Sequence, residues 1–164
     1  MPLSIHKVTV IPMAQLLGAL AENLEKARNY CDKNEINGEN FLRERLASDM
    51  MTLVEQVQRA CVNATGAVAR LTNSDLPEFA EDEKTFDDLQ QRITETLSYL
   101  RGYSEEQFEG SETMEVEVQT RVALLKFSGQ DYLLQFAIPQ VLFHVTTAHC
   151  IMRNQGVDIG KRDF

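Results

Sequence analysis

Residues 46–71, LASDMMTLVEQVQRACVNATGAVARL, carry the pattern that decides the fold. Apolar side chains recur here every three or four residues, which is the spacing of one face of an α-helix. They are Leu46, Met50, Leu53, Val57, Ala60, Cys61, Ala64, Val68 and Leu71. Small residues fill the second half of the stretch and would let another helix approach closely. We expect a helix over residues 40–71 that ends in the polar residues 72–75.

Three more segments show helical spacing. The first is residues 13–31, and the second begins near Thr85, a helix cap, and stops at Gly102. The last is largely apolar, starts at a cap in residues 128–131 and runs to 154–155, with Gly156 as its stop. Pro139 lies inside it, so this helix either kinks at Pro139 or begins there, and we expect the kink.

The sequence between the third and last helices alternates instead. Residues 114–119 and 122–127 fit two short strands around a tight turn at residues 120–121. A lone hairpin is marginally stable, so it must lie on the helices or pair with a partner chain. Residues 157–164 could form a surface strap. Four helices and one hairpin predict a mainly α-helical four-helix bundle, with residues 1–164 as one domain.

The charge is concentrated in one segment. The chain has 25 acidic and 16 basic residues, a net charge of −9, and residues 73–115 hold 13 of the acidic residues but only 3 of the basic ones. This segment is a solvated helix face, or it attracts a basic partner. The acidity argues against a nucleic-acid or membrane partner, and no apolar run is long enough to span a bilayer. Three cysteines without a CxxC pair, and no secretory leader, favour a cytoplasmic location.

A few polar side chains are candidates for a site. His144 lies on the last helix with Gln140 and Thr147 on its stripe, and it could be a packed core residue or a ligand. His149 is about 140° away around the helix, too far to share a metal ion with His144. Asp49 and Gln56 lie one heptad apart at the edge of the apolar stripe, and they line a pocket or mark the solvent boundary. Lys161 and Arg162 could hold an anion or pair with acidic surface.

Several ordered blocks resemble a bacterial family known as DUF1993. They are residues 45–50, 56–57, 86–89, 128–134, 143–148, 156–157 and 160–164. This family is similar to the DinB/YfiT-like group, which implies an up-down-down-up four-helix bundle, often dimeric, with the hairpin between the third and fourth helices. Many members of the group hold nickel or zinc with three histidines, and some are thiol-dependent S-transferases.

The metal motif of the group is not complete in this sequence. The motif has one histidine on the second helix and two about four residues apart on the last, whereas this chain has Asp49 and, four residues after His144, Ala148. We therefore expect no three-histidine site. At most, Asp49 and His144 would form a weak site for a divalent metal such as nickel, zinc or manganese.

The sequence favours a homodimeric, small-ligand-binding or accessory protein, and it does not decide whether the protein is an enzyme. The alternatives are a metal- or thiol-dependent transferase or hydrolase with a site around Asp49 and His144, and a protein-interaction module. The expected pocket comprises Asp49, Gln56, Tyr132, Gln140, His144 and Thr147.

Overall fold

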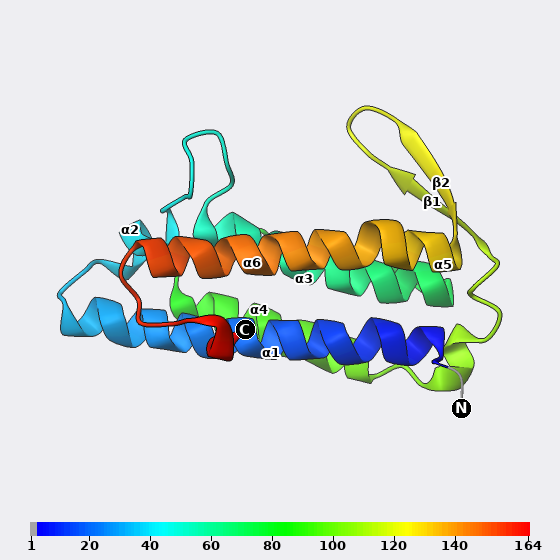
Figure 1. Cartoon of the computed structure of the whole chain (residues 1–164), viewed down its shortest axis with the longest axis horizontal. Coiled ribbons are helices and arrows are strands. Elements are labelled where there is room, and N and C mark those ends of the chain that lie inside the picture. The colour runs from blue at the N-terminus through cyan, green and yellow to red at the C-terminus, as the bar shows by residue number, and fades with distance from the viewer. Residues whose placement is uncertain (1–2) are drawn as a thin grey trace.

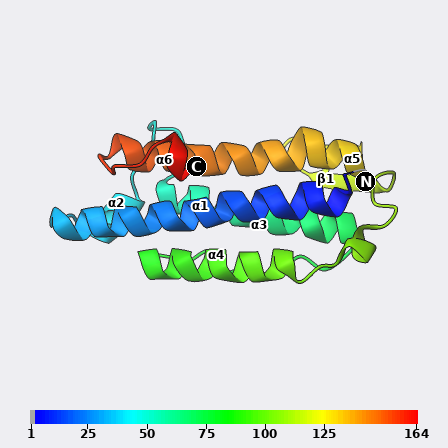
Figure 2. The same ribbon diagram turned by 60° about the horizontal axis from the view of Figure 1, so that its bottom comes forward.

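Four long helices form the bundle in the computed structural model, which describes residues 3–164 (Figure 1). They are α1 (Ile5–Lys33), α3 (Leu53–Thr72), α4 (Phe86–Arg101) and α6 (Ile138–Asn154). Helices α1 and α6 run in one direction, and α3 and α4 run in the other, so the topology is up-down-down-up. Each helix buries its apolar stripe in a shared core, and Figure 2 shows α1 lying between α6 and α4.

The sequence predicted one helix over residues 40–71, and this boundary is wrong. A short helix, α2 (Gly38–Leu42), is followed by a loop at residues 43–52, and α3 starts only at Leu53. The loop is held by Arg45, whose Nη1 donates to the Met50 carbonyl at 3.1 Å. Thr52 then opens α3 with a capping box, in which its side chain and that of Glu55 satisfy each other's backbone N–H groups. Leu46, part of the apolar pattern, is therefore 45% exposed.

The first helix is longer than predicted, and the third agrees with the prediction. Helix α1 begins at Ile5 with Ser4 as its cap. It contains Pro12, and the predicted helix over residues 13–31 starts only after this proline. Helix α4 begins after Thr85, whose capping box with Asp88 matches the expected start, and its C-cap is Gly102.

Residues 73–85 form a long crossover between α3 and α4. Because these two helices are parallel, the chain must return along the full length of the bundle before α4 can start. Residues of this crossover contact both helices through ion pairs and hydrogen bonds, as the next subsection describes.

The predicted hairpin is present. Strand β1 (Glu115–Gln119) pairs antiparallel with β2 (Leu124–Ser128), and the connection is a four-residue loop at 120–123 rather than a two-residue turn. A 3₁₀ turn, η1 (Glu105–Phe108), precedes it. Val116 and Val118 are buried, and the Phe127 ring packs against Tyr132 and Phe136. The hairpin thus lies on the helical segment that follows it.

The last helix runs past Pro139 without starting there. It begins at α5 (Gly129–Tyr132) under a Ser128 cap, widens in a π-helical turn η2 (Leu133–Ala137), and continues as α6 to Asn154. Gly156, which follows the end of the helix, has a φ of +101°. The π-helical turn moves the hydrogen-bonding pattern ahead of Pro139, where the missing N–H and the ring would disturb an α-helix. The tail then packs Val157 and Ile159 into the core and closes with a short turn, η3 (Lys161–Asp163).

Candidate functional site

His144 of α6 and Gln56 of α3 meet inside the bundle. The His144 Nδ1 and Gln56 Oε1 atoms are 2.7 Å apart, and the residues are only 7% and 1% exposed. Gln56 lies in the first turn of α3 because the Thr52 cap starts the helix there, which turns this side chain inward. A buried polar pair between two helices needs mutual hydrogen bonding to avoid a desolvation cost, and these two side chains satisfy each other.

A second hydrogen bond fixes which way the Gln56 amide faces. Its Nε2 donates to the Met51 carbonyl at 3.3 Å, so Oε1 is the atom that faces His144. Since Oε1 can only accept, the His144 Nδ1–H must donate, and the proton of a neutral ring is on Nδ1. The lone pair of Nε2 is then free of hydrogen bonds within residues 3–164, and this nitrogen is not sealed in the core.

The surroundings keep His144 neutral. Burial lowers the pKa of this imidazole below its ordinary value, and the positive charge of Arg59 lowers it further. At neutral pH the ring therefore presents an uncharged acceptor. Phe143 packs edge-on against it, with ring centroids 5.3 Å apart, and is itself 55% exposed. Met51, whose carbonyl holds Gln56, is 37% exposed, so two partly exposed apolar residues, Met51 and Phe143, lie near the His144–Gln56 pair.

The other predicted pocket residues do not join this pair. Asp49 lies on an exposed turn of the 43–52 loop, not on a helix. Thr147 is buried, and its hydroxyl donates to the Phe143 carbonyl within α6. Gln140 is half-buried one turn before His144. Tyr132 is buried about 18 Å away along the helix, where its hydroxyl accepts from Arg70.

His149 faces a different neighbour, as its spacing predicted. Its Nδ1 is 3.5 Å from Asn23 Nδ2 of α1, and its ring packs against Phe164 of the tail. The tail is anchored there by an ion pair between Asp163 and Lys26. Lys161 and Arg162 are exposed, and within residues 3–164 neither forms the expected ion pair with the acidic surface.

The side chains present do not fit the metal centre of the DinB/YfiT-like group. Within residues 3–164, no three His, Cys, Asp or Glu side chains lie close enough to bind one ion. The residue of α3 that reaches His144 is an amide, which is a poor ligand for nickel or zinc, and it already occupies Nδ1.

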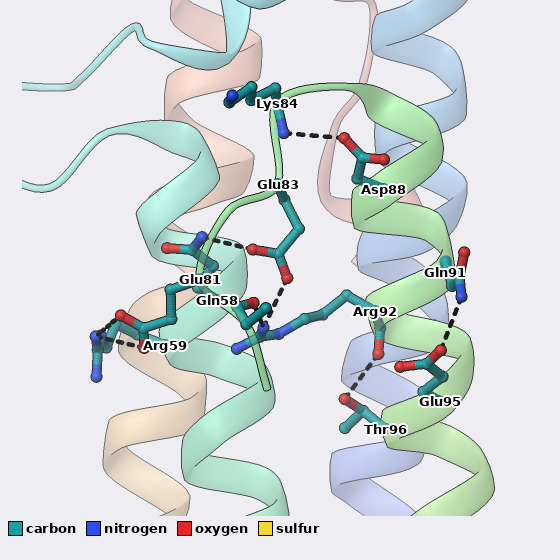
Figure 3. Close-up of polar contacts among 11 residues, drawn as sticks. Gln58, Arg59, Glu81, Glu83, Lys84, Asp88, Gln91, Arg92, Glu95 and Thr96 are labelled. Atoms are coloured by element: carbon teal, nitrogen blue, oxygen red, sulfur yellow. Dashed lines mark hydrogen bonds and ion pairs between the residues drawn. The ribbon is translucent and has the colours of Figure 1, made fainter. Parts of the chain in front are cut away.

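A second polar cluster, which we call the crossover clamp, was not predicted. It comprises Gln58, Arg59, Glu81, Glu83 and Arg92 (Figure 3). Glu83 accepts from Arg92 Nη1 at 2.6 Å and from Gln58 Nε2 at 2.7 Å, while Phe79 lies under the Arg92 guanidinium. The clamp fixes the crossover to α3 and α4. Arg92 is the only basic residue between Phe86 and Leu100, and its place beside Leu89 and Ile93 on the apolar stripe could have indicated a buried ion pair.

An acidic hollow of about 340 Å³ adjoins the clamp between the crossover and α4. Its lining includes the carboxylates of Glu78, Asp82 and Glu95. Neither His144 nor Gln56 lines this hollow, so the histidine pair and the hollow are separate features of the part of the chain that the structure describes.

The comparisons with known proteins agree on the family. Residues 5–164 match the model of a family described as DUF1993, a domain of unknown function. A DinB family member protein from Shewanella denitrificans has a similar solved structure, with a TM-score of 0.91 and 35% sequence identity, covering 97% of this chain and 90% of that one. No curated protein matches the sequence. None of the helices in residues 3–164 has the length and apolar character that crossing a membrane requires.

Proposed function

Because this chain belongs to the DUF1993 family and has the fold of a DinB family protein, we propose that it is a small-ligand-binding protein whose contact point is His144. The ligand would approach the accessible Nε2 between Met51 and Phe143. This proposal places the site where the bundle has a neutral, oriented histidine instead of three metal ligands.

The observation that carries the proposal is the hydrogen bond between Gln56 and His144. Two buried polar residues could have been replaced by apolar ones with little loss of stability, since net hydrogen-bond contributions are only about 1 kcal/mol. Here the pair satisfies Nδ1 of the ring and leaves Nε2 without a hydrogen-bond partner among residues 3–164. Such an arrangement is suited to receiving a ligand atom, and the exposed Phe143 ring offers it an apolar contact.

A ligand-detected NMR screen tests this proposal. We expect small organic probes that bind wild-type protein to lose binding in His144→Ala and to keep it in His149→Ala. The control is matched, because His149 is on the same helix but faces α1. If the probes bind equally well to His144→Ala and His149→Ala, the ligand site does not include His144.

Metal analysis of the purified protein separates this proposal from the metal-dependent enzyme. On our proposal, emission spectroscopy after reconstitution with nickel, zinc or manganese finds no metal that is lost in His144→Ala. A stoichiometric metal that disappears in this variant would instead favour a metal-dependent transferase or hydrolase, and Asp49→Ala would then test the second predicted ligand.

We also propose that the protein is a cytoplasmic homodimer that associates through α1 and α6. Residues 8–21 of α1 and 132–152 contain no Asp, Glu, Lys or Arg, although the chain as a whole is rich in charge. Helices α1 and α6 pack against each other, as the Asn23–His149 contact shows, and they expose Ile11 and Leu142 to 59% and 38%. The acidic surplus of the chain lies in residues 73–115, outside both segments, so the two segments themselves bring no like charges together.

Sedimentation measurements test the dimer. Leu142→Glu should shift the protein to monomer, whereas Leu124→Glu, at an exposed position on the hairpin, should not. Dissociation by the second variant alone would move the interface to the hairpin and contradict the α1–α6 face.

A further inference from the structure

A chain of two hydrogen bonds connects the 43–52 loop to the ring of His144. The Met51 carbonyl accepts from Gln56 Nε2 at 3.3 Å, and Gln56 Oε1 accepts from His144 Nδ1 at 2.7 Å. An amide has a donor end and an acceptor end, so fixing one end determines the other. The Met51 carbonyl therefore decides that Gln56 presents an oxygen, and not an NH₂ group, to the histidine.

The consequence reaches the far side of the ring. In a neutral imidazole one nitrogen carries the proton and the other carries a lone pair. With the proton held on Nδ1 by Gln56, Nε2 carries the lone pair, and it is the nitrogen that is not sealed in the core. A ligand with an N–H or O–H group can donate to this lone pair. An anion finds no donor at Nε2, and it would have to lose its hydration beside an uncharged ring and the apolar Phe143. The nearby cation, Arg59, is already paired with Glu81.

We propose that Gln56 is a positioning residue that fixes the Nδ1–H tautomer of His144, so that the site selects neutral ligands bearing a hydrogen-bond donor. This inference rests on the proposed function for the existence of a ligand, but its tautomer is a property of the free protein. Asp49, the residue that sequence spacing suggested, has no part in it, because it lies on the exposed turn.

The tautomer can be read without any ligand from long-range ¹H–¹⁵N correlations of the imidazole at pH 7.5. We expect a protonated Nδ1 and an unprotonated Nε2 in the wild-type protein. Gln56→Met has nearly the same shape but offers no acceptor, so the Nε2–H form should appear. Gln56→Glu keeps an acceptor oxygen and should retain the proton on Nδ1. If Gln56 only stabilises the fold, the tautomer of His144 should be the same in the wild-type protein and in both variants.

Selectivity is tested with phenol and benzoate, two probes of similar shape that differ in donor and charge. Phenol should bind about tenfold more tightly than benzoate to the wild-type protein and shift the Nε2 resonance, and this preference should shrink in Gln56→Met. An Nε2–H tautomer in the wild-type protein, or an equal or reversed preference, would overturn the inference. The tautomer can also be as expected while neither probe shifts Nε2. In that case both the proposed function and the selectivity for donors are wrong, and only the positioning role of Gln56 stands.

Discussion

The Arg92 guanidinium and the Glu83 carboxylate form the best-buried ion pair of the described chain. Nη1 and Oε1 are 2.6 Å apart, and the side chains are only 2% and 8% exposed. The pair connects the crossover to α4, and Gln58 extends it to α3. It therefore fixes the long crossover at residues 73–85, which the up-down-down-up topology requires.

Breaking this pair should be costly. Glu83→Ala would leave the Arg92 charge buried without its partner, and we expect the free energy of unfolding to fall by about 3–5 kcal/mol in urea denaturation. Glu81→Ala is the matched control, since Glu81 pairs with Arg59 on the same crossover but the two side chains are 46% and 37% exposed. The control should lose less than about 1 kcal/mol. Similar losses in the two variants would mean that the buried pair does not fix the crossover.

Two glycines should respond to alanine in opposite directions. A Cβ atom at Gly129 would lie 1.8 Å from the Ser111 carbonyl oxygen, so Gly129→Ala should destabilise the protein by about 1–3 kcal/mol or more. At Gly18, inside α1, a Cβ atom meets nothing within 4 Å. Gly18→Ala should therefore stabilise the protein by up to about 1 kcal/mol through helix propensity. Thermal denaturation of both variants checks the signs, and a stable Gly129→Ala protein would contradict the close approach.

A double-mutant cycle can measure the Gln56–His144 contact. Because the two side chains share a buried hydrogen bond, Gln56→Met and His144→Phe should be non-additive by at least about 0.5 kcal/mol in unfolding free energy. Asp49→Ala combined with His144→Phe should be additive, since Asp49 is exposed on the loop. The reverse result would restore the pairing that sequence spacing suggested.

The pKa of His144 predicts a pH dependence. Burial lowers the folded-state pKa below its ordinary value of 6.5, so below that pH the unfolded chain binds more protons than the native protein does. The free energy of unfolding should thus fall as pH drops from 7.5 through 6.5, and His144→Gln should make this slope shallower. The pKa of His149 is also lowered chiefly by burial, so this residue contributes in the same direction. Replacing both His144 and His149 with Gln should therefore make the dependence of the unfolding free energy on pH shallower still. A slope that is identical in wild type and both variants would contradict this assignment.

The helices were predictable where local chemistry and packing agree. Thr85 and Gly102 delimit α4 in the sequence as in the structure, because the capping residues stand next to the apolar stripe. At residues 43–52 the apolar spacing and the local capping residues disagree. Leu46 and Met50 continue the helical spacing, but the Thr52–Glu55 capping box starts a new helix. The box is visible in the sequence as T-x-x-E, and giving it more weight than the spacing would have located the boundary.

The site was only half predictable for the same reason. His144 and Gln56 were both candidates, but their pairing depends on where α3 starts, and that start was misplaced. Asp49 seemed equivalent to Gln56 because the two are one heptad apart on a helix that does not extend that far. The crossover clamp depends on contacts between segments that no periodic pattern connects, and only the isolated Arg92 in an apolar stripe hinted at it.

The π-helical turn at residues 133–137 has a consequence for how this family can change in length. Ile138 N–H donates to the Leu133 carbonyl, five residues back, so the turn holds one residue more than an α-helical turn would. Removing one exposed residue there, such as Gln135, and replacing Pro139, whose ring would disturb an α-helix, would leave an ordinary helix in which Tyr132 and His144 still face the core. Relatives one residue shorter at this point can therefore keep both ends of the helix in register, and a sequence alignment that treats such a gap as a shift of His144 would misplace the site.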